Sequence, residues 1–183
     1  MSSGTHSPAG GEAAVVGAVA APNDVRASFV LWLAAVAAGV FETILAIIEA
    51  VSGHSALGTG GVIAGVSMRL LIFTVVVYVA SQMLRGRNWA RFVLAIGLGV
   101  LGTLSIVIGP VSWLAEGHTI GEFLAGADLM LLLFASSRVV HLIAVFAALV
   151  LMFRPAANDY FRAARSARRL APGRTMPDRS ERK

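Results

Sequence analysis

The chain lacks cysteine altogether, which excludes disulfide bonds, thiolate metal ligands and thiol redox catalysis. Charge is also scarce, because Asp, Glu, Lys and Arg make up only 14% of the 183 residues, against about 25% in a soluble domain. Hydrophobic residues make up 57% of the chain, and the mean hydropathy is +0.78. This apolar excess has to face lipid, so we expect one membrane domain.

Lysine is nearly absent as well, since Lys183 is the only one among 15 basic residues. The net charge of +5 raises the question of a nucleic-acid partner. However, most of the basic residues lie at or after Arg154, next to the last apolar run, and no basic face interleaved with aromatic residues occurs elsewhere. Membrane topology explains this distribution better, and we expect no nucleic-acid partner.

Four apolar runs have the length of membrane-spanning helices. They cover residues 27–51, 61–84, 89–108 and 129–153. Thr119 and Glu122 form a capping-box pattern, which predicts a short interfacial helix before the last run. A final basic helix is expected at 159–170. The predicted fold class is therefore all-α: a four-helix transmembrane bundle with a short basic juxtamembrane helix at the C-terminus.

Polar residues mark the expected ends of these helices. Asn23 or Asp24 is expected to cap the first span, Asn88 the third span and Asn158 the final helix. The third span is expected to stop near Pro110, because proline cannot continue the hydrogen-bonding pattern of a helix.

Two spans carry pairs of small residues at a spacing that lets helices approach closely. The first span has Ala35 and Gly39, and the second begins with Gly61 and Gly65. Membrane helices associate through such small residues, so we expect helix contacts at both places.

Arginine-rich and acidic loops alternate along the chain. Arginines follow the second and fourth runs, whereas residues 111–128 hold three acids and no base. The positive-inside rule then places both termini in the cytoplasm of a multi-pass protein of the inner (plasma) membrane. We expect a flexible tail at 1–26 with a short helix near 12–20, a membrane domain at 27–153, and a basic tail at 154–183 that is disordered from 172. The residues expected at the membrane interface are Arg85, Arg87, Trp89, Arg91, Trp113, Tyr160, Arg162, Arg165 and Arg169.

Charged residues inside the spans predict a polar core. Glu42 and Glu49 are seven residues apart and therefore share one face of the first span. Arg69 and Arg138 lie at a similar depth to Glu42, and each unpaired charge near mid-membrane costs about 2.5–3.5 kcal/mol. We therefore predict that Glu42 contacts Arg69, Arg138 or both, with Glu49 as a second acceptor. His141 lies one turn from Arg138 and completes this core, which is expected to be open toward the outside.

The favoured interpretation of the core is structural: it fixes the helix order of a non-enzymatic scaffold or accessory subunit. A balanced set of acids and bases needs no substrate. The alternative is a small transporter or channel that uses Glu42, Arg69 and Arg138 to bind an anionic group or to move a proton or ion. A third interpretation, an intramembrane lipid enzyme, requires a lipid headgroup bound near Arg138.

No catalytic residue is assigned, because no serine is paired with a base and an orienting acid in a known motif, and arginine is too basic to act as a general base. We therefore expect no enzyme activity. No metal site or cofactor is expected either, since the spacing of Glu49, His54, Glu116 and His118 matches no known metal site. The expected partners are the lipid bilayer, with anionic lipid at the cytoplasmic face, and either a second copy of the chain or another membrane protein.

Two segments resemble elements of a protein family. Arg85-Gly-Arg-Asn-Trp-Ala-Arg91 and Arg154-Pro-Ala-Ala-Asn-Asp-Tyr-Phe161 are similar to the loop and tail junction of small uncharacterised four-span membrane proteins of high-G+C bacteria. The resemblance implies topology and membrane location, and no activity. Ile47-Ile-Glu-Ala-Val-Ser-Gly53 is also similar to the glutamate motif of small multidrug transporters. Close kinship with those transporters is excluded, because this glutamate lies near the end of its span and two arginines lie in later spans.

Overall fold

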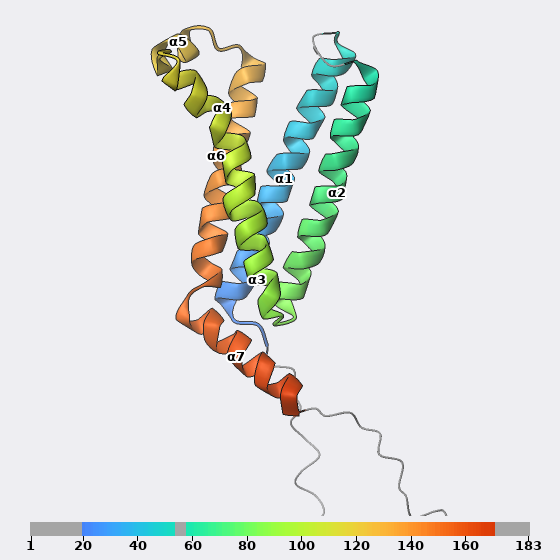
Figure 1. Cartoon of the computed structure of the whole chain (residues 1–183), viewed down its shortest axis with the longest axis vertical. Helices are drawn as coiled ribbons and strands as arrows, with labels where there is room; N and C mark the ends of the chain where they lie inside the picture. The colour runs from blue at the N-terminus through green and yellow to red at the C-terminus, as the bar shows by residue number, and fades with distance from the viewer. Residues whose placement is uncertain (1–19, 54–57, 171–183) are drawn as a thin grey trace, which may run out of the picture.

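The computed structural model describes residues 20–53 and 58–170, and within these ranges it is helical without strands (Figure 1). The predicted helix near 12–20, the turn residues 54–57 and the expected disorder from 172 lie largely or wholly outside the described residues. The helices are α1 (Asn23–Val51), α2 (Thr59–Leu84), α3 (Asn88–Leu94), the π-helix η1 (Ala95–Gly102), α4 (Thr103–Ala115), α5 (Ile120–Ala125), α6 (Leu129–Met152) and α7 (Pro155–Leu170).

Four helical segments are long and apolar enough to cross a membrane. They are α1, α2, the continuous segment α3–η1–α4 and α6. The protein is therefore an all-α, multi-pass membrane protein with a four-helix bundle, as the sequence predicted. The short helix α7 lies at one end of the bundle and α5 at the other (Figure 1). These two ends are referred to below as the α7 end and the α5 end.

The tightest contact in the bundle joins α1 to α6. Ala35 and Ala38 on α1 and Ala144 and Ala148 on α6 are all buried, and their small side chains let the two backbones approach closely. Ser28 on α1 donates a hydrogen bond of 2.9 Å to the backbone oxygen of Ala148. Side chains of α6 donate to backbone oxygens of α1 in return, as described below for the site.

The buried core lies in the half of the bundle nearest α7. Trp32, Met83, Leu94 and Met152 are almost completely buried there, and they come from four different spans. Toward the α5 end, the ribbons of α1 and α2 separate from those of α4 and α6 (Figure 1). Consistent with this separation, η1 and α4 bury none of their residues.

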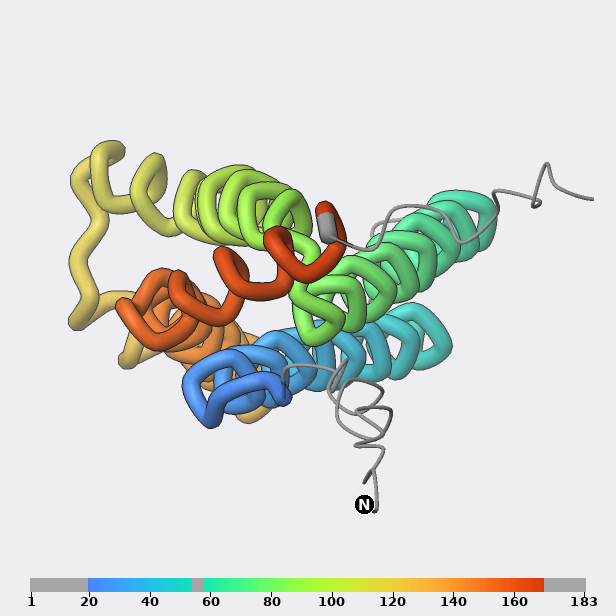
Figure 2. Tube along the Cα trace, turned by 90° about the horizontal axis from the view of Figure 1, so that it is seen from below, coloured from blue at the N-terminus to red at the C-terminus, as the bar shows by residue number. Residues whose placement is uncertain are grey.

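Helix α7 runs across the α7 end of the bundle and is docked against it (Figure 2). Ala157, Tyr160 and Phe161 are buried, so one face of this amphipathic helix packs on the spans. The Tyr160 hydroxyl donates a 2.6 Å hydrogen bond to the backbone oxygen of Leu84. Burial raises the pKa of the Tyr160 phenol, against a lowering by the Arg168 guanidinium, so the hydroxyl keeps its proton at neutral pH. The final helix is thus part of the folded bundle and not a solvated tail.

The helix ends differ from the sequence predictions in several places. Neither Asn23 nor Asp24 caps α1, whose capping position is Pro22, and Asp24 instead lies 3.4 Å from Arg154. Asn88 is the first residue of α3 and makes no capping hydrogen bond. The final helix begins at Pro155 and not at 159, because proline suits a first helical position, where no hydrogen bond from its nitrogen is needed.

The third span was predicted to stop near Pro110, and this prediction is wrong. Pro110 lies inside α4, which continues to Ala115. A proline removes one hydrogen bond from a membrane helix, and the neighbouring turns can absorb that loss. The capping box is confirmed, since Thr119 and Glu122 exchange both predicted hydrogen bonds at the start of α5.

The two small-residue pairs have different outcomes. Gly39 lies against α2, where an added β-carbon would come within 2.8 Å of the Phe73 ring, and Ala35 packs on α6. Gly61 is exposed, and an added β-carbon at Gly65 would meet only the guanidinium of Arg69, on its own helix. Within the described residues, the second pair therefore supports no helix contact.

Gly86 is the residue on which docking of α7 depends most directly. Its φ of +71° suits glycine, and an added β-carbon would lie 2.6 Å from the β-carbon of Ala164 on α7. Gly86 also accepts a hydrogen bond from Arg168 through its backbone oxygen.

We predict that Gly86→Ala releases α7 from the bundle, because it adds a steric clash to the backbone strain of about 1–2 kcal/mol. Gly117→Ala is the matched control, since Gly117 has a φ of +94° with nothing near the added β-carbon. Limited trypsin digestion should cleave α7 faster in Gly86→Ala than in Gly117→Ala, and a second change, Ala164→Gly, should restore part of the protection. Equal cleavage of the two single variants would contradict the proposed clash.

Candidate functional site

A cavity of about 470 Å³ lies between α1, α2, α6 and the η1–α4 segment. Four of the five residues predicted for the polar core line it: Glu42, Arg69, Arg138 and His141. Glu42, Arg69 and Arg138 lie on different helices. Along the helix axis, each backbone position is ~14–15 Å from the α5 end of its helix, at ~1.5 Å of rise per residue. Glu42, Arg69 and Arg138, which the sequence places at a similar depth, therefore do line one cavity.

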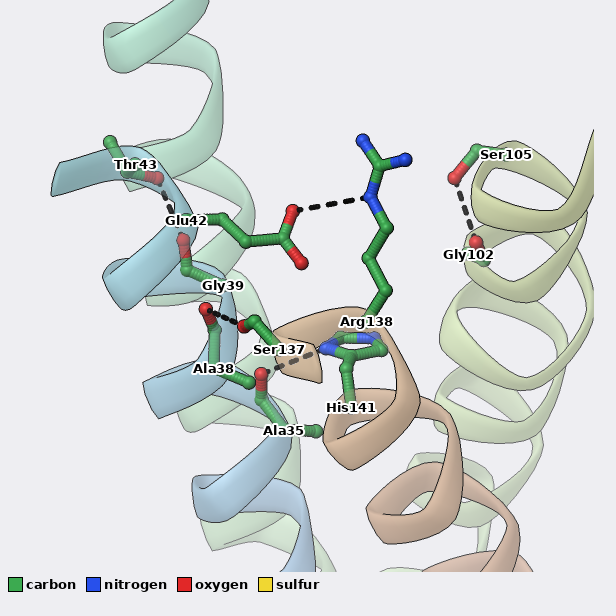
Figure 3. Close-up of polar contacts among 10 residues, drawn as sticks. All are labelled: Ala35, Ala38, Gly39, Glu42, Thr43, Gly102, Ser105, Ser137, Arg138 and His141. Atoms are coloured by element: carbon green, nitrogen blue, oxygen red, sulfur yellow. Dashed lines mark hydrogen bonds and ion pairs between the residues drawn. The ribbon is translucent and has the colours of Figure 1, made fainter. Parts of the chain in front are cut away.

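Glu42 and Arg138 form the predicted ion pair. Arg138 Nε lies 3.8 Å from Glu42 Oε2, and Figure 3 shows the two side chains pointing toward one another from α1 and α6. This distance is too long for a hydrogen bond, so the contact is a loose ion pair. The Arg138 side chain is 46% exposed, against 20% for Glu42. The arginine is therefore held near the carboxylate without being enclosed by it.

Arg69 lines the same cavity from α2 but makes no comparable contact. No carboxylate of the described residues lies within 4 Å of it. Its guanidinium instead lies beside Gly65, one turn nearer the α5 end of its own helix. The prediction that Glu42 would contact Arg69, Arg138 or both is thus met by Arg138, and Arg69 remains available to another group.

His141 is positioned by the backbone of α1. Its Nδ1 lies 2.9 Å from the backbone oxygen of Ala35, and this oxygen can only accept, so Nδ1 carries the proton. When the ring is neutral, Nε2 is left as an acceptor beside the cavity. One turn away, the Ser137 hydroxyl donates to the backbone oxygen of Ala38 at 3.1 Å (Figure 3). These two bonds hold α6 against α1 directly below the ion pair.

Glu49 does not belong to the site, contrary to the sequence prediction. It does not line the cavity, and it has no ion pair with the described residues. Glu49 lies about two helical turns beyond Glu42, in the part of α1 that has separated from α6. Sharing a helical face was therefore not enough: α2 still lies beside α1 toward the α5 end, but α6, which carries Arg138, has separated from α1 (Figure 1).

The residues predicted for the membrane interface fall into two groups. Two of them, Arg91 and Tyr160, are buried at the α7 end, with exposed fractions of 5% and 7%. Arg91 lies beneath α7, and Tyr160 lies on the face of α7 that packs on the spans, so protein encloses both side chains; their depth at a membrane interface stays a prediction. The remainder are exposed or half-buried: Arg85, Arg87, Trp89, Trp113, Arg162, Arg165 and Arg169.

One side of the cavity is formed by η1, which the sequence did not predict. Gly97, Leu98 and Gly102 line it, and an added β-carbon at Gly97 would meet nothing within 4 Å. The π-helical turns widen the backbone here, and such turns occur frequently at functional sites. The signal in the sequence is the run Ala-Ile-Gly-Leu-Gly-Val-Leu-Gly, in which Gly97 and Gly102 line the cavity while Gly99 lies against Leu149 of α6.

The charges around the cavity are unbalanced. Two arginines and one carboxylate line it, so the lining carries a net positive charge while His141 is neutral. Arginine presents a fork of donors that suits carboxylate, phosphate or sulfate groups. Among the described residues, no group of three or more His, Asp or Glu side chains is placed to hold a metal ion. The arrangement can therefore bind an anion electrostatically.

We predict that the Glu42–Arg138 pair contributes about 1 kcal/mol or less to stability, because its contact is long and its arginine half-exposed. A double-mutant cycle with Glu42→Gln and Arg138→Gln, followed by unfolding in detergent micelles, measures this coupling. The cycle of Glu42→Gln with Arg69→Gln is the control and should show a coupling near zero. A Glu42–Arg138 coupling of about 3 kcal/mol or more, typical of breaking an enclosed pair, would contradict the geometry.

Comparison of the chain with protein-family models, with curated proteins and with solved structures finds no match. What the structure itself shows is an all-α, multi-pass membrane protein. Any more specific role has to be argued from the cavity.

Proposed function

We propose that this protein binds a small anionic solute in the cavity between its spans, as a small transporter does. The observation that carries the proposal is the excess of arginine: Arg69 and Arg138 line a cavity of about 470 Å³, and among the described residues Glu42 is the only carboxylate in its lining. An unpaired charge at membrane depth is costly, and an anion bound between the arginines would neutralise it.

The loose ion pair suits reversible binding. Because Arg138 is about half exposed and lies 3.8 Å from Glu42, it can turn toward an entering anion without breaking a close hydrogen bond. Arg69 would approach the same anion from α2. Removal of the solute would return Arg138 to the carboxylate. By this proposal the protein binds and releases its ligand and does not modify it chemically.

A scaffold or accessory subunit is the second candidate, and a specific observation favours it. The η1 and α4 helices bury none of their residues in the single chain, although they form part of a spanning segment. A helix of another membrane protein, or of a second copy, would cover this surface. In that case the Glu42–Arg138 pair would serve only to hold α1 beside α6.

We predict that anions stabilise the purified protein and that Arg69→Gln/Arg138→Gln abolishes this effect. The test is thermal unfolding in phosphatidylcholine nanodiscs with inorganic phosphate, sulfate, acetate or succinate. At a concentration about 100 times the dissociation constant, a bound anion adds about 2.7 kcal/mol of stability. Equal stabilisation of the wild type and of the double variant by every anion would show that the cavity is not the binding site.

A variant that fills the cavity without changing its charge separates binding from general electrostatics. Gly97→Leu places a side chain in the open space beside η1, and we expect it to weaken anion binding. Gly109→Leu is the matched control, because Gly109 lies on the same span, has open space around it and does not line the cavity. Uptake of the stabilising anion by proteoliposomes would support transport. If Gly109→Leu, and not Gly97→Leu, instead disrupted a stable complex of the protein with a second copy or another membrane protein, the subunit role would be favoured.

A further inference from the structure

A second positively charged pocket lies at the α7 end, far along the bundle from the cavity. It has a volume of about 370 Å³ and is formed between the start of α3 and one side of α7. Three arginines line it: Arg91 from α3, and Arg162 and Arg165 from α7. Asn88 and Asn158 add amide groups, and no carboxylate of residues 20–53 or 58–170 belongs to the lining.

Arg91 differs from the other two arginines of this pocket because its side chain is buried in the folded protein. The residue is only 5% exposed, and its guanidinium carbon lies 4.6 Å from the ring centres of both Phe153 and Phe161. Cation–π contacts of this kind hold a guanidinium in place without neutralising it. Arg91 Nη2 donates a 2.7 Å hydrogen bond to Asn158 Oδ1, which is also a neutral partner.

The buried guanidinium also has an unused donor. Arg91 Nε is buried and has no hydrogen-bond partner among the described residues. A buried donor without a partner is unfavourable, and a buried cation without a counter-charge is more so. An anion in the pocket would supply the counter-charge that the described residues around Arg91 do not provide.

The two arginines of α7 can complete such a site. Arg165 and Arg162 are exposed side chains on the same helical face, three residues apart. Arg162 pairs with Asp159 at 2.6 Å, but this pair is largely exposed on both sides and is therefore weak. Both arginines can turn toward a ligand that Arg91 holds from below.

We propose that this pocket binds a phosphate group, carried either by an anionic lipid headgroup or by a free phosphate. Several arginine donors converging from different helices suit the oxygens of a phosphate better than a single carboxylate. The pocket is separate from the cavity between the spans, so the proposal does not depend on the proposed function. It gives α7 a role as one wall of a binding site.

The experiment compares two double variants that remove the same amount of charge. Arg162→Gln/Arg165→Gln removes both arginines that α7 contributes to the lining of the pocket. Arg87→Gln/Arg169→Gln removes two exposed arginines at the same end that do not line it. Arg91 is left intact, because its removal would also disturb the packing of α7. Circular dichroism and limited chymotrypsin digestion, which cleaves after aromatic residues and not after the arginines that the variants remove, check that all proteins are folded with α7 docked.

The full chain is reconstituted in phosphatidylcholine nanodiscs with a minority of phosphatidylglycerol, and native mass spectrometry counts the lipids retained. We expect enrichment of phosphatidylglycerol by the wild type and the Arg87/Arg169 control. The Arg162/Arg165 variant should lose about tenfold or more in preference, because it removes two arginine donors from the lining of the pocket, whereas the control removes the same charge outside it.

Titration of inorganic phosphate into nanodiscs of phosphatidylcholine alone identifies the source of the phosphate. Because the cavity between the spans is itself proposed to bind anions, this titration uses the Arg69→Gln/Arg138→Gln background. Binding in that background that is lost when Arg162→Gln/Arg165→Gln is added would assign the pocket to free phosphate. Lipid enrichment without such binding would assign it to a headgroup. Equal behaviour of the two double variants in both assays, or no binding by the wild type in either, would overturn the proposal.

Discussion

The close contact between α1 and α6 is the constraint from which the rest of the structure follows. Lipid offers no hydrophobic reason for two apolar helices to associate, so small residues and polar side chains have to supply the attraction. Ala35 and Ala148 let the backbones approach, and the hydroxyls of Ser28 and Ser137 donate to backbone oxygens across the contact. Toward the α5 end the two helices separate (Figure 1).

That separation divides the protein into two halves with different properties. The α7 half is packed around Trp32, Met83 and Met152 and is closed by α7. The α5 half is loosely packed, with a π-helix instead of a regular helix beside the cavity. A rigid half and an open half suit a protein that binds a ligand between its spans, because the closed half keeps the helices in place while the open half admits the ligand.

The two candidate sites use arginine in different ways. Arg138 is held loosely by a carboxylate and is about half exposed, so its charge is available for exchange with a ligand. Arg91 is enclosed between two aromatic rings, so its position is preset and only its charge remains to be satisfied. The first arrangement favours reversible binding, and the second favours a persistent structural ligand. The cavity lies within the bundle and the second pocket at its α7 end.

The sequence by itself determined the number of spans, the all-helical class and the capping box at Thr119, because each follows from hydropathy and local hydrogen bonding. Depth in the membrane was also enough to predict that Glu42 meets an arginine. Only the tertiary structure decided that this is Arg138 and not Arg69, and that Glu49 is left out. The first outcome depends on how the side chains of α1 face α6 and α2, and the second on where α1 and α6 separate. The rotation and separation of the helices are set by contacts between segments that are distant in the sequence, so they cannot be predicted from the sequence of one helix.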